Sequence, residues 1–234
     1  MYINFKKIIK MDDSTQEREM NFNYLLKYVI VGDASVGKSN LLLRYTHGQF
    51  REEYQLTIGV EFGSNNITID DNIYRVQIWD TAGQENFKSI TRSYYKNSAC
   101  ALIVYDITSR ISFESLTNWI DDCKNSSPKT VVMVLVGNKS DLDKSREVNE
   151  EEGRDFAEKN GMLFFETSAK TGKNVEEVFK ESATLIAKKI KENYYDLDND
   201  ACGIKKGEDE NNLVLHDSLE SENKKKRMLS IKSS

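Results

Sequence analysis

The sequence predicts an α/β fold: a six-stranded, mostly parallel sheet with one antiparallel edge strand and with helices on both faces. From about residue 24 onward, short apolar runs alternate with longer amphipathic stretches, which is typical of strands and helices in turn. Only residues 70–72 (Asp-Asp-Asn) separate the second and third apolar runs, so these two strands form a hairpin and pair antiparallel. The other strands are separated by helices long enough for right-handed parallel crossovers, which makes the rest of the sheet parallel.

The individual elements follow from the same periodicities. The apolar runs predict strands at residues 25–31, 59–69, 73–79, 99–105, 131–136 and 163–166. The amphipathic stretches predict helices at residues 38–47, 89–96, 112–125, 150–160 and 174–193. Strands and helices thus alternate along most of the chain, which is the order that a parallel sheet requires.

The chain of 234 residues is long enough for one domain of about 150–200 residues with a tail at each end. Residues 1–23 are polar and lack periodicity, so we expect an N-terminal extension there. We expect one folded domain over residues 24–195. The polar residues 196–234, acidic at first and basic from Lys224 to Arg227, predict a disordered tail.

Composition disfavours several classes of protein. A net charge of −5 argues against a general nucleic-acid binder, which should be basic. The two histidines, His47 and His216, are too few for a histidine metal cluster. The cysteines, Cys100, Cys123 and Cys202, form no C-x-x-C pair and indicate a reducing, cytosolic compartment. The apolar runs are too short to span a bilayer, and the charged N-terminus lacks the apolar core of a secretory signal.

A phosphate-binding motif lies between the first expected strand and the first expected helix. Residues 32–39 read G-D-A-S-V-G-K-S and match G-x-x-x-x-G-K-[ST]. The glycines let backbone N–H groups curl around a phosphate, Lys38 supplies a cation to the outer phosphates, and Ser39 offers a hydroxyl to magnesium. The alternative is a chance glycine turn before a helix, which the strand and helix context disfavours.

A carboxylate, Asp80, ends the third expected strand, at the sheet edge where parallel α/β folds bind ligands. We expect it to reach magnesium through a water molecule. An aspartate at a strand end is also often a turn cap. The nearby phosphate loop favours the metal-binding interpretation.

Two further loops predict recognition of a guanine base. Residues 138–141 (N-K-S-D) follow the fifth strand, and the Asp141 carboxylate can accept hydrogen bonds from the ring N–H and the exocyclic amine of guanine. Adenine lacks both donors and would leave the carboxylate unpaired, at a penalty of about 1–3 kcal/mol per lost bond. Residues 166–170 (E-T-S-A-K) can present the backbone N–H of Ala169 to the guanine oxygen. Each loop in isolation also fits a simpler role, a polar turn or a helix-capping loop.

The motifs occur in the order found in small GTPases, namely the phosphate loop, Thr57, D-T-A-G-Q at 80–84, N-K-S-D at 138–141 and T-S-A-K at 167–170. The resemblance covers about residues 24–194 and implies a P-loop small GTPase fold, with residues 24–195 as the GTPase domain. Four shorter segments resemble the Rab branch of membrane-traffic switches: I-G-V-E-F at 58–62, W-D-T-A-G-Q-E at 79–85, S-Y-Y at 93–95 and Y-D-I-T at 105–108.

The resemblance implies that the chain binds GTP or GDP together with Mg²⁺. The implied magnesium-binding residues are Ser39, Thr57 and Asp80. The implied nucleotide-binding residues are Ala34, Ser35, Val36, Gly37, Lys38, Ser39, Asn40, Phe50, Tyr54, Thr57, Gly83, Asn138, Lys139, Asp141, Ser168, Ala169 and Lys170.

The same resemblance implies roles in catalysis. Gln84 would orient the attacking water, Lys38 would neutralise charge on the γ-phosphoryl group, and Thr57 would sense that group. Phe50 would pack on the guanine, and Tyr54 would close over the phosphates. No arginine is evidently placed to act in cis, so we expect slow intrinsic turnover, on the order of 10⁻⁴ to 10⁻² per second, and strong acceleration by an activating protein.

Residues 50–62 and 82–95 are expected to be ordered by the γ-phosphate and released on hydrolysis. The resemblance implies that an exchange factor, a GTPase-activating protein and effectors bind these segments, with Phe62, Trp79 and Tyr94 as aromatic contacts. Core packing is the alternative for these three aromatic residues. We expect a monomer that binds no nucleic acid.

We therefore expect a GTP-hydrolysing molecular switch that regulates vesicle and membrane traffic. A soluble, non-prenylated GTP-binding scaffold that does not cycle on membranes is the alternative, because the last cysteine is Cys202 and no prenyl anchor is evident. The basic run Lys224 to Arg227 fits weak peripheral attraction to anionic lipid or a solvated tail. We expect a cytoplasmic protein, with the cytosolic face of endomembranes as a further location. Asn138 and Asp141 disfavour an ATP-using P-loop enzyme.

Overall fold

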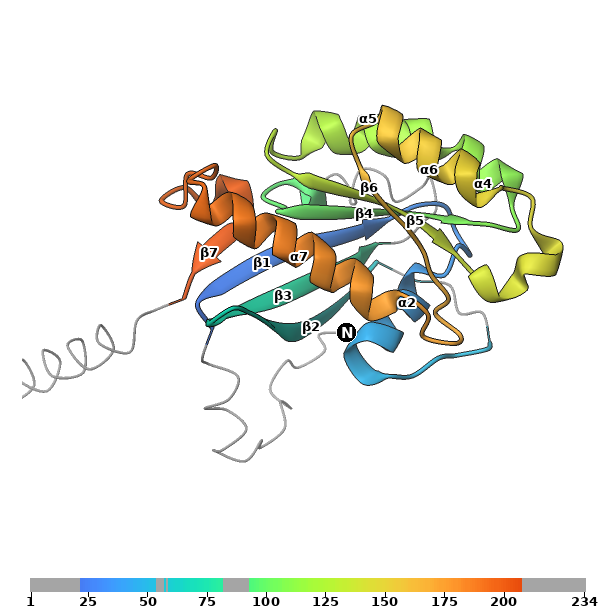
Figure 1. Ribbon diagram of the computed structural model, residues 1–234, viewed down its shortest axis with the longest axis horizontal. Helices are drawn as coiled ribbons and strands as arrows, with labels where there is room; N and C mark the ends of the chain where they lie inside the picture. Colours follow the sequence, from blue (N-terminus) through green and yellow to red (C-terminus); the bar gives the residue numbers. More distant parts are fainter. Residues whose placement is uncertain (1–21, 54–56, 58, 82–92, 208–234) are drawn as a thin grey trace, which may run out of the picture.

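The structure, a computed structural model, describes residues 22–53, 57, 59–81 and 93–207 (Figure 1). Its sheet has the strand order β2-β3-β1-β4-β5-β6, and a further strand, β7, pairs with β1. The β2–β3 and β1–β7 pairs are antiparallel, and the other neighbours are parallel. The predicted α/β fold with a mostly parallel sheet is confirmed, with one short strand more than expected.

The strands lie close to their predicted positions. They are β1 (Tyr24–Val31), β2 (Val60–Ile69), β3 (Asn72–Thr81), β4 (Cys100–Asp106), β5 (Val132–Asn138), β6 (Leu163–Glu166) and β7 (Ile204–Lys206). The helices are α2 (Lys38–His47), α4 (Arg110–Glu114), α5 (Leu116–Ser126), α6 (Glu150–Lys159) and α7 (Val175–Lys191), with short 3₁₀ segments η2 (Ser140–Ser145) and η3 (Asp200–Cys202).

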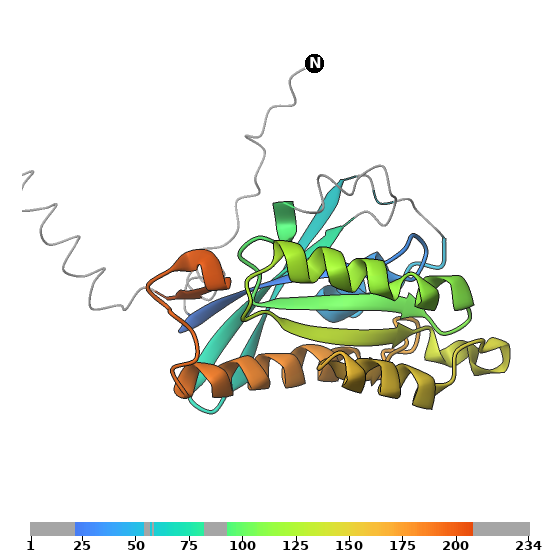
Figure 2. The same ribbon diagram turned by 90° about the horizontal axis from the view of Figure 1, so that it is seen from above.

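Helices cover both faces of the sheet, and each face has its own apolar cluster. One cluster contains side chains of α2 and α7, and the other contains side chains of α4, α5 and α6. Figure 2 shows α5 and α7 on opposite sides of the sheet. Successive residues of β1 alternate between the two clusters: Tyr28 and Ile30 face α2 and α7, whereas Val29 and Val31 face the other layer. Residues 28–31 of β1 are buried on both faces, which explains why this part of the strand is a continuous apolar run.

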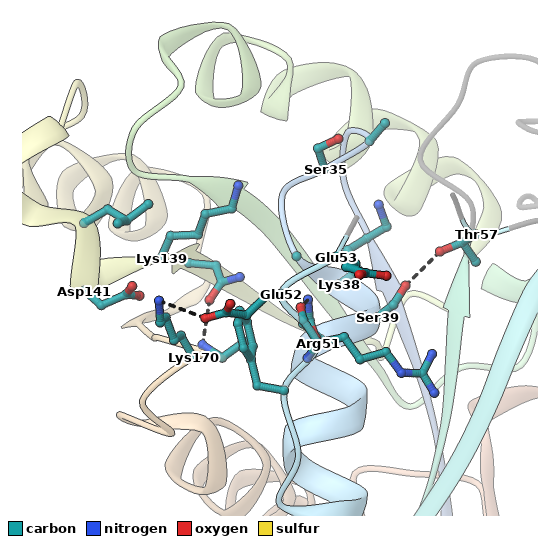
Figure 3. Close-up of a pocket in the computed structure, with 17 residues that line it drawn as sticks. Ser35, Lys38, Ser39, Arg51, Glu52, Glu53, Thr57, Lys139, Asp141 and Lys170 are labelled. Atoms are coloured by element: carbon teal, nitrogen blue, oxygen red, sulfur yellow. Dashed lines mark hydrogen bonds and ion pairs between the residues drawn. The ribbon is translucent and has the colours of Figure 1, made fainter. Parts of the chain in front are cut away.

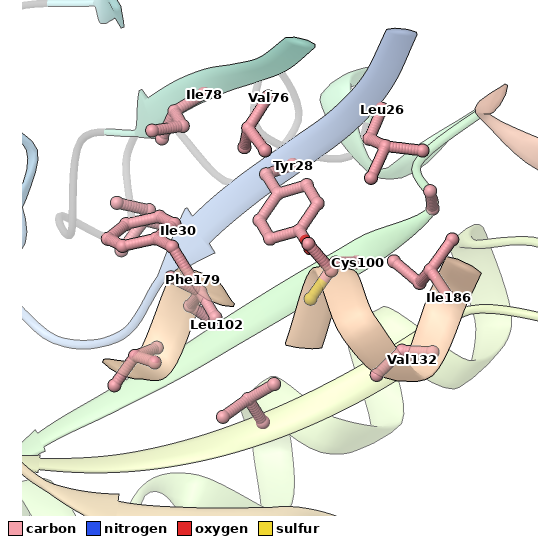
Figure 4. Close-up of a cluster of buried hydrophobic side chains, with 14 of the residues drawn as sticks. Leu26, Tyr28, Ile30, Val76, Ile78, Cys100, Leu102, Val132, Phe179 and Ile186 are labelled. Carbon is pink, nitrogen blue, oxygen red and sulfur yellow. The ribbon is translucent and has the colours of Figure 1, made fainter. Parts of the chain in front are cut away.

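Tyr28 shows how a polar group is accommodated in this core (Figure 4). Its ring is fully buried and stacks near Phe179 of α7, with ring centroids 6.2 Å apart. Its hydroxyl lies 3.1 Å from Ser182 Oγ, so this buried oxygen is hydrogen-bonded. The contact joins the central strand β1 to α7.

Two of the predicted helices differ from the structure. The helix expected at residues 112–125 begins earlier, at Arg110, and is interrupted at Ser115, which separates α4 from α5. The backbone N–H and the hydroxyl of Ser115 both donate to the carbonyl of Ile111, and such a second bond from a serine side chain often bends a helix. The helix expected at residues 89–96 lies mainly outside the described residues.

The C-terminal boundary of the fold corrects the sequence-based expectation, because residues 196–207 are part of the domain and not of a disordered tail. β4 begins opposite Tyr28, which leaves residues 24–26 of β1 without a neighbour on that side. β7 fills this position, with Ile204 opposite Leu26. Ile204 is fully buried and Cys202 nearly so, although most residues around them are polar. The expectation for residues 208–234 concerns a part of the chain outside the described residues.

Within the described ranges, no helix combines the length and the apolar character needed to cross a bilayer.

Candidate functional site

A pocket of about 480 Å³ lies beyond the carboxyl ends of the parallel strands (Figure 3). The loops that follow β1, β5 and β6 meet there, and the segment after α2 forms a further wall. This is the edge at which open α/β sheets bind ligands. The lining residues are Ala34, Ser35, Gly37, Lys38, Ser39, Asn40, Phe50, Arg51, Glu52, Glu53, Thr57, Asn138, Lys139, Asp141, Leu142, Ala169 and Lys170.

The loop between β1 and α2 presents the start of a helix to the pocket. No side chain among the described residues caps this end of α2, so its first backbone N–H groups can bind an anion. Gly37, with φ of 97°, approaches the Asn138 side chain so closely that a Cβ atom would lie 2.3 Å from Asn138 Nδ2. A glycine is required here both by the left-handed backbone and by this close approach.

Lys38 is held along the inner side of the same loop. Its Nζ donates to the carbonyl oxygens of Gly32 and Asp33, at 2.9 and 2.7 Å. Burial lowers the pKa of Lys38 to about 8, and the Asp80 and Asp33 carboxylates oppose this effect. An anionic phosphate in the pocket would favour the charged form of the amine, as those carboxylates do.

Three oxygen-bearing side chains meet beside Lys38. Ser39 Oγ lies 2.8 Å from Thr57 Oγ1 and donates to Asp80 Oδ2 at 2.5 Å. The other carboxylate oxygen, Asp80 Oδ1, is buried and has no hydrogen-bond partner among the described residues. Burial raises the pKa of Asp80 to about 6, while Lys38 and Ser39 act to lower it. A buried, unpaired carboxylate oxygen beside two hydroxyl groups fits a hard divalent cation such as Mg²⁺.

The loops after β5 and β6 are joined by side-chain hydrogen bonds. Asn138 Nδ2 donates to the carbonyl of Val36 in the phosphate loop, and Asn138 Oδ1 accepts from Thr167 Oγ1 and from the backbone N–H of Ala169. Ser168 Oγ donates to Asp141 Oδ1 at 2.6 Å, which orients the exposed Asp141 carboxylate. Asn138 therefore connects the phosphate side of the pocket to the side predicted to bind the base.

The wall formed by residues 50–53 is attached at two points. Arg51 exchanges two hydrogen bonds with the Asn40 side chain of α2, at 2.9 and 3.0 Å. Glu52 Oε1 lies 3.5 Å from Lys170 Nζ across the pocket, as the dashed line in Figure 3 shows. The sequence did not single out four of the lining residues: Arg51, Glu52, Glu53 and Leu142. Arg51 and Glu52 are placed by contacts with Asn40 and Lys170 that no local motif encodes.

The structure brings most residues of the predicted nucleotide site into one pocket. Two of the predicted residues, Val36 and Ser168, are buried behind the lining and act through a carbonyl and a hydroxyl, respectively. Asp80 likewise lies behind Ser39. Tyr54, Gly83 and Gln84 lie outside the described residues.

The three predicted contact aromatics form one cluster on the surface of β2 and β3. Phe62 and Trp79 pack edge to face with ring centroids 5.0 Å apart, and Tyr94 lies 5.4 Å from Trp79. Phe62 is 53% exposed, so the cluster is not simply part of the core.

A phosphate loop, an Asp–Ser–Thr oxygen cluster and an N-K-x-D loop on a mostly parallel sheet define a P-loop GTP-binding protein. The Ras family profile matches residues 27–188. The chain is also 53% identical over 176 residues to the Ras-related protein Rab-2B of Dictyostelium discoideum, an alignment that covers 75% of this chain and 87% of that protein. The chain belongs to the Ras family and is a Rab-type small GTPase.

Proposed function

We propose that this GTPase is a molecular switch that regulates vesicle traffic on cytoplasmic membrane surfaces. The observation that carries the proposal is the convergence, in one pocket, of the phosphate loop, the Ser39–Thr57 hydroxyl pair and the base loop with Asn138 and Asp141. Each part matches one portion of a guanine nucleotide bound with Mg²⁺: the phosphates, the metal ion and the base. Membership of the Ras family agrees with this, because its GTPases bind guanine nucleotide, generally with Mg²⁺.

Hydrolysis in this proposal depends on positioning and electrostatics. Lys38 and the N–H groups at the start of α2 bind the β- and γ-phosphates and neutralise their charge. Ser39 and Thr57 would hold Mg²⁺, with Asp80 behind them, and the bound ion would neutralise charge that develops on the phosphate oxygens. We assign the orientation of the attacking water to Gln84.

The nucleotide-binding residues that we propose are Ala34, Ser35, Val36, Gly37, Lys38, Ser39, Asn40, Phe50, Tyr54, Thr57, Gly83, Asn138, Lys139, Asp141, Ser168, Ala169 and Lys170. Guanine is selected by Asp141, whose carboxylate accepts from the ring N–H and the amine, and by the Ala169 N–H, which donates to the guanine oxygen. The hydrogen bond from Ser168 supports this role because it orients Asp141.

Partners would bind residues 50–62 and 82–95, in line with the regulators and effectors that Rab proteins have in general. The exposed Phe62, packed on Trp79 and Tyr94, supports an effector contact at this surface. We propose a monomer that is cytoplasmic and associates with the cytosolic face of endomembranes. A scaffold that does not cycle is not favoured by the similarity to Rab-2B.

The test is nucleotide selectivity in a matched pair of aspartate variants. Asp141→Ala should weaken GDP and GTP binding by about tenfold or more, because a charged acceptor of two hydrogen bonds is lost, and should leave the weak binding of ADP unchanged. Asp143→Ala is the control, since Asp143 is exposed and pairs with Arg146 outside the pocket. Equal affinity of the unmodified protein for GDP and ADP would overturn the proposal.

A further inference from the structure

Arg44, in the last turn of α2, donates hydrogen bonds to three backbone carbonyls. Its Nε donates to Ala169 at 2.8 Å, its Nη2 to Lys170 at 2.7 Å and its Nη1 to Gly48 at 2.5 Å. The first two acceptors lie 125 and 126 positions away in the sequence. One half-buried guanidinium therefore joins α2 to the loop after β6.

The three acceptors flank the side of the pocket that we assign to the base. Ala169 and Lys170 line this pocket, and Gly48 lies two residues before Phe50, which lines it from the other side. Gly48 is held from two directions, because its own N–H donates to the carbonyl of Arg44 at 2.9 Å. Arg44 itself is not among the lining residues, so it acts from behind the pocket wall.

The chemistry of the side chain suits this task. The guanidinium is planar and carries several N–H donors in a fixed fork, so one side chain can hold three carbonyls in a defined arrangement. A lysine ammonium at this position would keep the charge but not the fork. The stem of Arg44 also packs beside the loop: its Cδ lies 3.8 Å from the place that a Cβ atom on Gly172 would occupy.

The other links to the loop after β6 act on different groups of that loop. Asn138 joins the Val36 carbonyl to the Ala169 N–H, the latter at 3.3 Å. The Glu52–Lys170 ion pair is long and exposed, and such pairs contribute little. Arg44 instead hydrogen-bonds to the backbone carbonyl oxygens of Ala169 and Lys170.

We propose that Arg44 is a positioning residue for guanine recognition. By fixing the carbonyls of Ala169 and Lys170, it sets the place of the Ala169 N–H. The hydrogen bond from this N–H to Asn138 Oδ1 is long, at 3.3 Å, so the N–H can share itself with the guanine oxygen. The inference rests on the proposed function, because it assumes that this N–H contacts the base. Loss of Arg44 should therefore weaken the contact with the guanine oxygen more than the contacts with the phosphates.

The test compares dissociation of GDP and of 6-thio-GDP from Arg44→Ala and Arg44→Lys. The analogue keeps the N–H and amine that Asp141 reads but replaces the oxygen with sulfur, a weaker acceptor. In both variants GDP should dissociate about tenfold faster, whereas 6-thio-GDP should dissociate no more than about threefold faster. The preference of the unmodified protein for GDP over the analogue should shrink accordingly. The lysine variant keeps the test usable if the alanine variant does not fold.

Arg154→Ala is the matched control, since Arg154 on α6 pairs with Glu150 and lies over Phe164, away from the pocket. It should leave both rates unchanged. Equal acceleration of GDP and 6-thio-GDP in the Arg44 variants would indicate general loosening and overturn the positioning role, as would unchanged rates. Failure of the unmodified protein to prefer GDP over ADP would instead overturn the proposed function.

Discussion

The indole Nε1 of Trp119 donates a hydrogen bond of 2.7 Å to Asp33 Oδ1, which joins the buried face of α5 to the phosphate loop. Asp33 thus accepts two hydrogen bonds: its carboxylate accepts from Trp119, and its backbone carbonyl accepts from Lys38 Nζ. An anionic side chain in a phosphate-binding loop is unfavourable for an anionic ligand unless it is held away or neutralised. The hydrogen bond from Trp119 fixes the orientation of this carboxylate.

Trp119→Phe should therefore weaken GDP binding by roughly tenfold, because a hydrogen bond to a charged acceptor is lost while most of the apolar volume is kept. Asp33→Asn retains an oxygen acceptor and removes the charge, so it should have a smaller effect or improve affinity. Titration with a fluorescent GDP derivative measures both. Equal affinity of Trp119→Phe and the unmodified protein would show that the loop does not depend on this contact.

Asp80→Asn should separate stability from metal binding. The charged Asp80 carboxylate is buried, and one of its oxygens has no hydrogen-bond partner within the described part of the chain, so the neutral amide should raise the melting temperature of the protein in EDTA. The same change should lower Mg²⁺ affinity about 10- to 100-fold, as loss of a metal-supporting carboxylate generally does. Thermal unfolding with and without Mg²⁺ gives both values. A lower melting temperature in EDTA would contradict the destabilising effect of the buried charge, and an unchanged Mg²⁺ affinity would contradict the proposed metal role of Asp80.

The Arg110–Glu152 ion pair predicts a pH dependence of stability. The two side chains join α4 to α6 through two hydrogen bonds, and the Arg110 guanidinium lowers the pKa of Glu152 below its usual value of 4.5. A lowered carboxylate pKa contributes stability that is present above pH 4.5 and is lost as the pH falls through the lowered pKa. Both side chains are more than a third exposed, so the contribution should stay below about 1 kcal/mol.

Glu152→Gln should accordingly reduce the free energy of unfolding at pH 7 and reduce it less at pH 4, as measured by urea unfolding. Glu151→Gln is the control, because Glu151 on the same helix is exposed. A larger loss at pH 4 than at pH 7 would contradict the sign of this linkage.

The pairing of β7 with β1 predicts that residues 204–206 contribute to the stability of the domain. Ile204→Ala should reduce the free energy of unfolding by about 2–4 kcal/mol, because a fully buried aliphatic side chain is shortened. Lys206→Ala, at an exposed position of the same strand, should change it by less than about 0.5 kcal/mol. A similar small effect of both substitutions in urea unfolding would show that β7 is not a stable part of the sheet.

Much of the fold and of the candidate site could be predicted because the signals are local. The alternation of apolar runs and amphipathic stretches placed β1 to β6 within a few residues of their observed bounds. The motif containing Lys38 and Ser39 specified a phosphate loop, and the order of the later motifs indicated the family, which the comparisons confirmed. Such patterns depend on residues close together in the chain, so a sequence displays them directly.

The remaining features depend on contacts between distant residues, and only the folded chain reveals them. β7 was missed because two buried side chains, Cys202 and Ile204, are too few to show a periodicity, while its pairing depends on a space beside β1 left by the late start of β4. The bonds from Arg44 to the loop after β6 and from Trp119 to Asp33 join residues 125 and 86 positions apart. The packing of helices on the sheet determines which of these residues meet. It brings hydrogen-bonding groups within 3 Å of each other, although no local pattern in the sequence connects them.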